Sequence, residues 1–238
     1  MTTGGPSLLR WTGFLALAAM ALATRALGDD TKPDAWPEVD AFVGLNDRSR
    51  LLLSVAGSRS RQESYTDLTL GAHIDIFLKP ISRPWLRGTP DIEKRRYLFF
   101  RIGYRYGQGL GDDADAYREH RILLETTGRA YLPGRLVALN RNRFDLRDLQ
   151  GEDSWRYRNR TRLEREFPAW SRSVTTYAMA ELFYDSRYES WTRKRYYAGV
   201  EWPLGRSSVV DTYYCRQDDS QPSSADVNAF GLALNLFF

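Results

Sequence analysis

The side chains that could carry out chemistry in this chain are few in kind. The 238 residues contain two histidines, His73 and His120, and a single cysteine, Cys215. One cysteine excludes an internal disulfide framework and any multi-cysteine metal site. Two histidines leave little room for a histidine-based metal centre. We therefore expect neither a metal ion nor a cofactor.

Nucleophilic catalysis needs a nucleophile and a base within hydrogen-bond reach, and a third group that orients the base. His73 lies on the polar face of an alternating stretch with no serine nearby in the sequence, and His120 falls on the opposite face from its neighbours Glu119 and Arg121. The chain has no Gly-x-Ser-x-Gly elbow and no His-Glu-x-x-His zinc motif. These observations predict that the protein is not an enzyme.

Charged residues recur at alternate positions and favour ion pairing over acid–base catalysis. Arg156, Arg158, Arg160 and Arg162 form one stripe that continues to Glu164. Arginine binds carboxylates through two parallel hydrogen bonds, so these guanidinium groups are natural partners for the glutamates of the chain. The net charge of +4 is too close to balance to indicate a nucleic-acid partner.

The elements that carry these residues alternate with period two, which is the side-chain period of a β-strand. The clearest stretch, 67–78, places leucine and isoleucine on one face and Asp67, Thr69, Gly71, His73 and Asp75 on the other. We count eleven such stretches, beginning near residues 39, 50, 67, 98, 117, 135, 155, 174, 193, 207 and 227. Each has roughly ten to fifteen residues, enough for a tilted strand to cross a bilayer.

The count of eleven conflicts with the even strand numbers of bacterial barrels. Either the stretch near Val39 is not a full strand, or a further strand is hidden. We therefore expect a single antiparallel transmembrane β-barrel of 10–12 strands, with 10 or 12 in place of an odd number and 12 preferred. Short turns at 46–47, 133–134 and 203–205 alternate with longer polar loops at 107–116, 145–154, 185–191 and 216–225.

Alternation alone does not say which face meets solvent, because soluble barrels carry the same pattern inside out. The ending of the chain favours a membrane. Its last strand alternates Phe230, Leu232, Leu234, Leu236 and the terminal Phe238 with small or polar residues. This ending resembles the signal by which the barrel-assembly machinery recognises bacterial outer-membrane proteins.

The positions of the charged and aromatic residues also favour a membrane barrel. An arginine that faces lipid at mid-membrane costs about 2–4 kcal/mol, so the arginine stripe is expected to face the lumen. Trp155, Tyr184 and Trp202 fall on apolar faces near strand ends, where amphipathic rings suit a membrane interface. Two stretches fit less well, because 135–145 is mixed on both faces and Asn159 and Thr161 interrupt an apolar face.

With the polar face inward, the lumen gathers many charged side chains of both signs. We expect them to form a network of ion pairs that fills the lumen, and the alternative is a charged conduit or a site for a small anionic ligand. The predicted luminal residues are Arg101, Arg105, Glu119, Arg121, Glu125, Arg129, Arg158, Arg160, Arg162, Glu164, Glu181, Arg193, Arg195 and Glu201.

The N-terminus predicts export. An apolar run at 13–23 follows Arg10, and small residues around Gly28 follow Arg25. This is the pattern of a secretory signal peptide, and eleven apolar residues are about half of what a spanning helix needs. Cleavage after Ala23 or Gly28 fits the pattern, and Gly28 is preferred. We predict a signal peptide at 1–28 and a barrel domain at 29–238 in the bacterial outer membrane.

Several short motifs resemble one family. Gly-Tyr-Arg-Tyr at 103–106 precedes Tyr-Arg-Glu-His-Arg at 117–121, and the arginine-rich stretch 155–166 precedes Ala-Glu-Leu-Phe at 180–183. From about Trp36 to Phe238 the chain resembles the bacterial family catalogued as domain of unknown function 2490, a group of predicted outer-membrane barrels. That family usually has Asn where this chain has Ala180. The resemblance implies a fold and a location, and it transfers no catalytic residue.

The sequence thus favours a structural or weakly conducting outer-membrane barrel whose partners are lipid and the assembly machinery. Two alternatives of other classes stay open. One is a lipid-modifying hydrolase with a serine and a histidine near the outer rim. The other is a soluble periplasmic barrel that binds a ligand.

Overall fold

The computed structural model describes residues 34–59, 66–78, 94, 96–110, 118–169, 172–220 and 226–238. Within these ranges there is no helix long and apolar enough to cross a membrane. Eleven strands account for most of the described residues. They are β1 (Asp34–Asn46), β2 (Ser49–Arg59), β3 (Thr66–Phe77), β4 (Leu98–Leu110), β5 (Arg118–Leu132), β6 (Leu136–Leu149), β7 (Glu152–Ala169), β8 (Arg172–Asp185), β9 (Ser190–Pro203), β10 (Ser208–Asp219) and β11 (Val227–Phe237).

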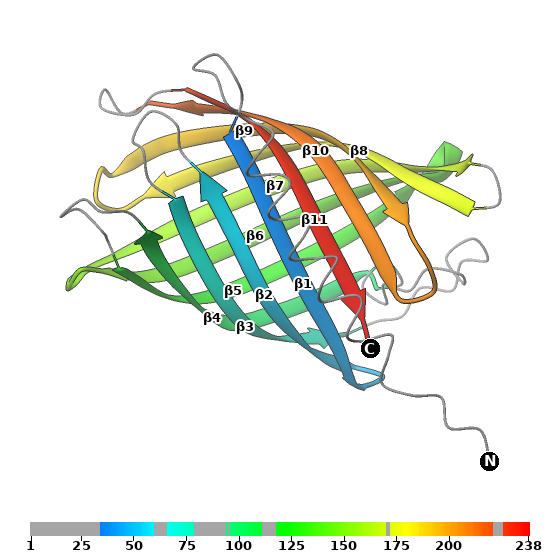
Figure 1. Ribbon diagram of the computed structural model, residues 1–238, viewed down its shortest axis with the longest axis horizontal. Coiled ribbons are helices and arrows are strands. Elements are labelled where there is room, and N and C mark those ends of the chain that lie inside the picture. The colour runs from blue at the N-terminus through cyan, green and yellow to red at the C-terminus, as the bar shows by residue number, and fades with distance from the viewer. Residues whose placement is uncertain are drawn as a thin grey trace.

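The strands follow one another around a single closed barrel in which each pairs antiparallel with its sequence neighbours (Figure 1). The closing pair is the exception. β1 and β11 are parallel, in a register that runs from Asp34 opposite Ala229 to Phe42 opposite Phe237. An up-and-down barrel with an odd number of strands must close in this way, because its first and last strands run in the same direction.

The eleven alternating stretches of the sequence are therefore eleven strands, and the all-β barrel is confirmed. The expectation of an even number was wrong for the described chain, since the stretch around Val39 is a full strand of 13 residues. The parallel seam removes the need for a twelfth strand, because it satisfies the edges of β1 and β11 with each other. Main-chain hydrogen bonds continue the seam to the last residue, where Phe238 N donates to Phe42 O at 2.8 Å.

The barrel has an apolar outside and a polar inside. Large hydrophobic side chains stand exposed on the outer faces of neighbouring strands, for example Ile74, Ile102, Leu124 and Leu163. Buried positions on the inner faces hold arginine and carboxylate side chains instead. A continuous exposed apolar belt is costly in water and suits the hydrocarbon of a bilayer. The fold is that of a transmembrane β-barrel.

The connections are shorter than the sequence suggested. A polar loop was expected at 145–154, but β6 and β7 are joined by two residues, Gln150 and Gly151, with φ of 57° and 88°. Positive φ at both positions is the geometry of a tight hairpin turn. The expected loop at 185–191 is likewise a short turn between Asp185 and Ser190. A turn of 3-10 helix, η3 (Pro133–Arg135), joins β5 to β6 where Pro-Gly predicted it.

Some predictions fall outside the described residues. The signal peptide at 1–28 and the first residues of the barrel domain are among them. Most of the segment between β3 and β4, and parts of the connections at 60–65, 111–117 and 221–225, also lie outside.

The poorly fitting outer face of β6 and β7 is explained by a cluster of amides. Asn142 donates to Asn140 Oδ1 at 2.8 Å, Asn159 donates to Asn142 Oδ1 at 2.9 Å, and Asn140 donates to Thr161 Oγ1 at 3.1 Å. Tyr157 closes the cluster with a bond of 2.6 Å to Asn142. Transfer of a polar group from water to an apolar environment costs less free energy when the group is hydrogen-bonded to another. This face therefore remains compatible with an apolar environment.

The two ends of the barrel differ. We call the end where β1 begins the N-terminal end, and the end that holds Phe238 and the β1–β2 turn the C-terminal end. On the β1–β4 side, aromatic rings fill the lumen towards the C-terminal end. Phe42 stacks on Phe237 with centroids 5.0 Å apart, and Phe77 packs on Phe99 at 5.8 Å. Phe77 and Phe99 are buried, so this part of the lumen is closed.

Candidate functional site

The structure places all fourteen predicted luminal residues on the inner faces of β4, β5, β7, β8 and β9, where each is buried or half-buried. The period of two explains this directly, since residues of one parity on a strand share one face. The period does not predict which charged residues pair with one another. The ion pairs depend on the register between strands and on how far each side chain extends across the lumen.

Glu181 is the centre of the largest cluster. Its side chain is fully buried, and it stands opposite Arg160 in the register of β7 and β8. Its carboxylate accepts hydrogen bonds from Arg158 at 2.8 Å, Arg160 at 3.0 Å and Arg141 at 2.9 Å. Arg141 comes from β6 and also lies 3.6 Å from Glu125. Three guanidinium groups thus share one carboxylate in the middle of the lumen.

A second cluster surrounds Asp185 near the N-terminal end. Its carboxylate accepts hydrogen bonds from Arg156 at 2.7 Å, Arg147 at 3.0 Å and Arg187 at 3.1 Å. Glu119 bridges Arg147 to Arg121. Arg187 lies in the turn outside the strands, and its hydrogen bonds to Asp185 raise the pKa of its guanidinium. The cluster ties four neighbouring strands, β5 to β8, together at this rim.

A third cluster lies towards the C-terminal end. Arg162 pairs with Glu164 at 2.9 Å and also with Glu201. Lys94, which precedes β4, reaches in to pair with Glu201. Tyr177 donates to Asp211 at 3.0 Å beside them. The carboxylates of this cluster therefore bind a lysine from outside the strands as well as an arginine from the wall.

Further pairs complete the network. Asp75 accepts from Arg50 at 2.7 Å and from Arg101 at 2.5 Å, and Arg101 also lies 3.9 Å from Glu125. Asp145 pairs with Arg143 at 2.5 Å. Charge clusters thus recur along the length of the barrel, and truncating one partner of such a buried pair leaves the other charge uncompensated.

Some predicted residues have other contacts. Arg193 pairs with Asp219 at 2.6 Å. Arg195 donates to Gln217 at 2.7 Å and stacks over the ring of Trp36, with no carboxylate partner among the described residues. Arg105 makes one contact with the described residues, a long bond of 3.4 Å from its Nε to His73 Nε2. Arg129 is buried on the inner face of β5.

Sequence reasoning missed several members of the network. One signal could have found those of β6, because arginine or aspartate stands at every second position from Arg141 to Arg147. That stretch was obscured by the asparagines of its other face and by the loop expected from 145. The members missed are Arg50, Asp75, Lys94, Arg141, Arg143, Asp145, Arg147 and Asp185.

The residues of the predicted assembly signal face outward. Phe230 and Phe238 are exposed, and Leu232, Leu234 and Leu236 are half-buried on the same face of β11. Their partners of the other parity, such as Ala229 and Ala233, are buried in the barrel. The apolar edge of the last strand is therefore presented to the surroundings of the barrel.

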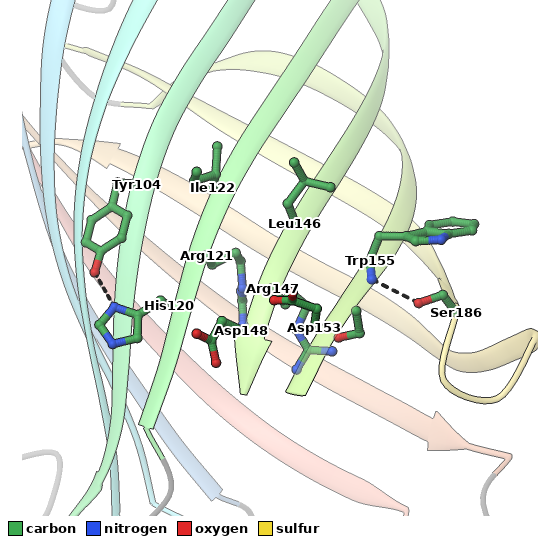
Figure 2. A pocket seen from close by; sticks show the side chains of 11 residues that line it. Tyr104, His120, Arg121, Ile122, Leu146, Arg147, Asp148, Asp153, Trp155 and Ser186 are labelled. Atoms are coloured by element: carbon green, nitrogen blue, oxygen red, sulfur yellow. Dashed lines mark hydrogen bonds between the residues drawn. The ribbon is translucent and has the colours of Figure 1, made fainter. Parts of the chain in front are cut away.

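A groove of about 570 Å³ lies near the N-terminal ends of β5 and β7 (Figure 2). Its lining includes Ile122, Leu146 and Trp155, which belong to the exposed apolar surface, and Asp148 and Asp153, which face each other in register. The groove therefore joins the apolar belt to a polar edge. This is the arrangement expected where a barrel meets the headgroup region of a membrane.

The groove contains His120 and Ser186, and each of these side chains is hydrogen-bonded to another residue. His120 Nδ1 is 2.6 Å from the hydroxyl of Tyr104, while Ser186 Oγ accepts from the main-chain N of Trp155 at 2.9 Å. Figure 2 shows these two bonds at opposite ends of the groove. Within the described ranges, no group of three His, Cys, Asp or Glu residues could hold a metal ion.

Comparisons with known proteins identify the family of the chain. No curated protein matches the chain. Among solved structures, the chain is similar to the β-domain of the Bordetella autotransporter BrkA, with 15% identity and a TM-score of 0.43 over 76% of this chain and 78% of that one. The family model described as "Protein of unknown function (DUF2490)" matches residues 46–228. The chain belongs to the DUF2490 family.

Proposed function

We propose that the protein is an outer-membrane β-barrel with a lumen closed by ion pairs, and that its role is structural or weakly conducting. The observation that carries the proposal is the inverted polarity of the barrel. Its outside is an exposed apolar surface, and its inside holds fully buried carboxylates such as Glu181 and Asp185 with their arginines. A soluble periplasmic binder would place the apolar face inside.

The location rests on two features of the sequence. The N-terminal pattern is that of a bacterial export signal. The last strand presents alternate apolar residues and the ring of Phe238 outward, as a substrate of the barrel-assembly machinery would. Lipid and that machinery are the proposed partners, and nucleic acid is not among them. The N-terminal end, which carries the groove, is the proposed extracellular end, because the short turns at 47–48, 133–135 and 204–207 lie at the C-terminal end. Some connections depart from this pattern: the turn at 150–151 is short although it lies at the N-terminal end, and the connection from β3 to β4 is long although it lies at the C-terminal end.

We expect weak conduction because side chains fill much of the lumen. Arginine side chains from β6 and β7 reach the carboxylate of Glu181 in the middle of the barrel, and aromatic rings fill its β1–β4 side towards the C-terminal end. Little lumen is left for a continuous column of water. Arginine outnumbers glutamate among the predicted luminal residues, so any residual conductance should favour anions.

The proposal includes no catalysis. Its support is the separation of His120 from Ser186, which bond different partners at opposite ends of the groove. A lipid-modifying hydrolase is the alternative, and it would need a serine to reach His120 on binding lipid. An assay for fatty-acid release, with His120→Asn as the control, tests it. Release by the native protein that is lost in the variant would favour the hydrolase.

Heat-modifiability tests the proposed function itself. A folded membrane barrel extracted in detergent should migrate differently on a gel before and after boiling. It should also require detergent for extraction from the membrane fraction. Recovery in the soluble periplasmic fraction without detergent would contradict the proposal.

A further inference from the structure

Three charged luminal groups on one side of the barrel, in β1 and β4, make no ion pair with the described residues. Arg105 on β4 makes only its long contact with His73, and Glu38 and Asp40 on β1 have no hydrogen-bond or ion-pair partner among the described residues. Other luminal carboxylates accept from arginine or lysine, from tyrosine in the case of Asp211, and from Ser58 in the case of Asp67. All three residues are half-buried, and Asp40 Oδ1 is a buried atom with no hydrogen-bond partner among the described residues. Withdrawing an ionised group from water without a partner is costly, so a bound ligand that pairs with these groups would stabilise them.

The three groups face one another across short side chains. In register, Asp40 stands opposite Ser54, Ser54 opposite Gly71, and Gly71 opposite Arg105. Neither Glu38 nor Asp40 comes within ion-pairing distance of Arg105. The serine and the glycine of this row are short, and the ring of His73 lies over Gly71. The row therefore has positive charge at one end and negative charge at the other.

Polar groups converge over Gly71. A Cβ atom there would lie 2.3 Å from Ser54 Oγ, 2.6 Å from His73 Nε2 and 3.3 Å from Arg105 Cγ. Arg105 thus leans over Gly71 towards β2 and β1. His73 is 1% exposed and its Nδ1 has no hydrogen-bond partner, and Ser54 is 4% exposed. Buried polar groups of native proteins are rarely left unpaired, so unpaired groups gathered in one place mark a binding position.

The surroundings of this row are asymmetric. On the side of the C-terminal end lie Phe42 and Leu52, both buried, and then the Phe77–Phe99 pair. On the side of the N-terminal end, the inner faces of β2, β3 and β4 carry only short side chains. These are Ala56, Ser58, Asp67, Thr69, Gly107 and Gly109. Among the described residues of these three strands, a small molecule that enters from the N-terminal end meets only short side chains before it reaches the aromatic rings.

We propose that this row binds a small zwitterion, a compound that carries a carboxylate or phosphate and an ammonium group a few atoms apart. Arg105 binds the anionic group of the ligand, with Ser54 and His73 beside it. Asp40 and Glu38 bind its ammonium group. The carboxylates are what distinguish this ligand from the simple anion suggested by the excess of arginine, because two unpaired carboxylates would repel an anion. The inference rests on the inward polar face of the barrel and does not depend on which membrane holds it.

The test measures binding to the full-length folded barrel in detergent by isothermal titration calorimetry. The probes are glycine, β-alanine, γ-aminobutyrate and phosphoethanolamine, with acetate, inorganic phosphate and ethylammonium as single-charge controls. At least one zwitterion should bind, and it should bind more tightly than either of its halves. Arg105→Gln should weaken that binding by about 10- to 100-fold, the ratio expected for loss of a charged hydrogen bond. Asp40→Asn with Glu38→Gln should weaken it similarly.

Matched variants separate the site from the general charge of the lumen. Arg195→Gln removes another luminal arginine without a carboxylate partner and should leave binding unchanged. The Asn and Gln replacements on β1 keep the shape of the side chains, so they still test the proposal if Arg105→Gln does not fold. Acetate or phosphate binding as tightly as the zwitterions, or no binding by any probe, would overturn the inference. Heat-modifiability and low conductance would stand in either case, so failure here is distinct from failure of the proposed function.

Discussion

Glu181 on β8 stands directly opposite Arg160 on β7, and the carboxylate of this pair is fully buried. Arg158 and Arg141 add two more guanidinium groups to the same oxygens. Replacing the carboxylate leaves three arginines that repel one another in a place with little water. The stability of the barrel should therefore depend strongly on this one residue.

Glu181→Gln should lower the free energy of unfolding by about 3–5 kcal/mol, the range for breaking a buried ion pair. Asp218→Asn is the matched control, because Asp218 pairs with Arg216 at 2.7 Å on the exposed rim. An exposed pair contributes about 0–1 kcal/mol. The unfolding midpoint of each variant, read from gel shifts of detergent-solubilised protein, gives the comparison. Equal midpoints would contradict a luminal network centred on Glu181.

Labelling should distinguish the two faces of β7. In a Cys215→Ser background, a cysteine in place of Leu163 should react with a lipid-soluble maleimide, because Leu163 is exposed on the outer face. A cysteine in place of Arg160 should not, because Arg160 points into the lumen towards Glu181. Lipid-phase labelling at position 160 would reverse the assignment of inside and outside.

Phe238 contributes both an exposed ring and main-chain hydrogen bonds to the seam. Its N donates to Phe42 O at 2.8 Å, and its O accepts from Gly44 N at 3.0 Å. Deleting the residue should reduce assembly and leave protein in the periplasm. Phe238→Ala keeps both main-chain bonds, so reduced assembly of this variant as well would assign the effect to the ring. Membrane fractionation measures both, and unchanged yield of folded protein from the deletion would count against the assembly signal.

The purified barrel in planar bilayers should show small or no conductance. Phe77→Ala with Phe99→Ala removes two buried rings that close the β1–β4 side and should increase conductance. Tyr188→Ala removes an exposed aromatic side chain from the turn after β8 and should have no effect. Large stable openings of the unaltered protein would instead indicate a porin.

Gly231 is required by a ring that lies over it. A Cβ atom there would be 1.9 Å from Tyr213 Cζ, so Gly231→Ala must displace a tyrosine packed inside the barrel. Overpacking of this kind costs about 1–3 kcal/mol. Gly128→Ala should cost nothing or stabilise slightly, because a Cβ atom at Gly128 has no neighbour within 4 Å. The unfolding midpoints of the two variants test this. A similar decrease in both midpoints would show that the close approach of Tyr213 does not require glycine at position 231.

Strand positions and faces followed from the sequence because one period governs both. Each of the eleven alternating stretches is a strand, and a residue such as Glu125 or Arg158 could be assigned to the inner face by parity alone. The ends of the strands were harder to predict where charged residues continue to the end of a strand. Asp145 to Ser154 suggested a loop by composition, yet the strands continue to Leu149 and resume at Glu152. Inside a charged lumen, polar residues belong to strands as readily as to loops.

The closure of the barrel and the pairing of its luminal charges were decided by the tertiary structure. The parallel pairing of β1 with β11 joins residues almost two hundred positions apart, and nothing local in either strand specifies it. Arg147 reaches Asp185 two strands away, and Arg105 stays apart from Asp40 across Ser54 and Gly71. Local periodicity sets the direction of each side chain relative to its own strand. Which opposite charges meet depends on stagger and curvature, because these bring distant strands to the same level of one narrow lumen.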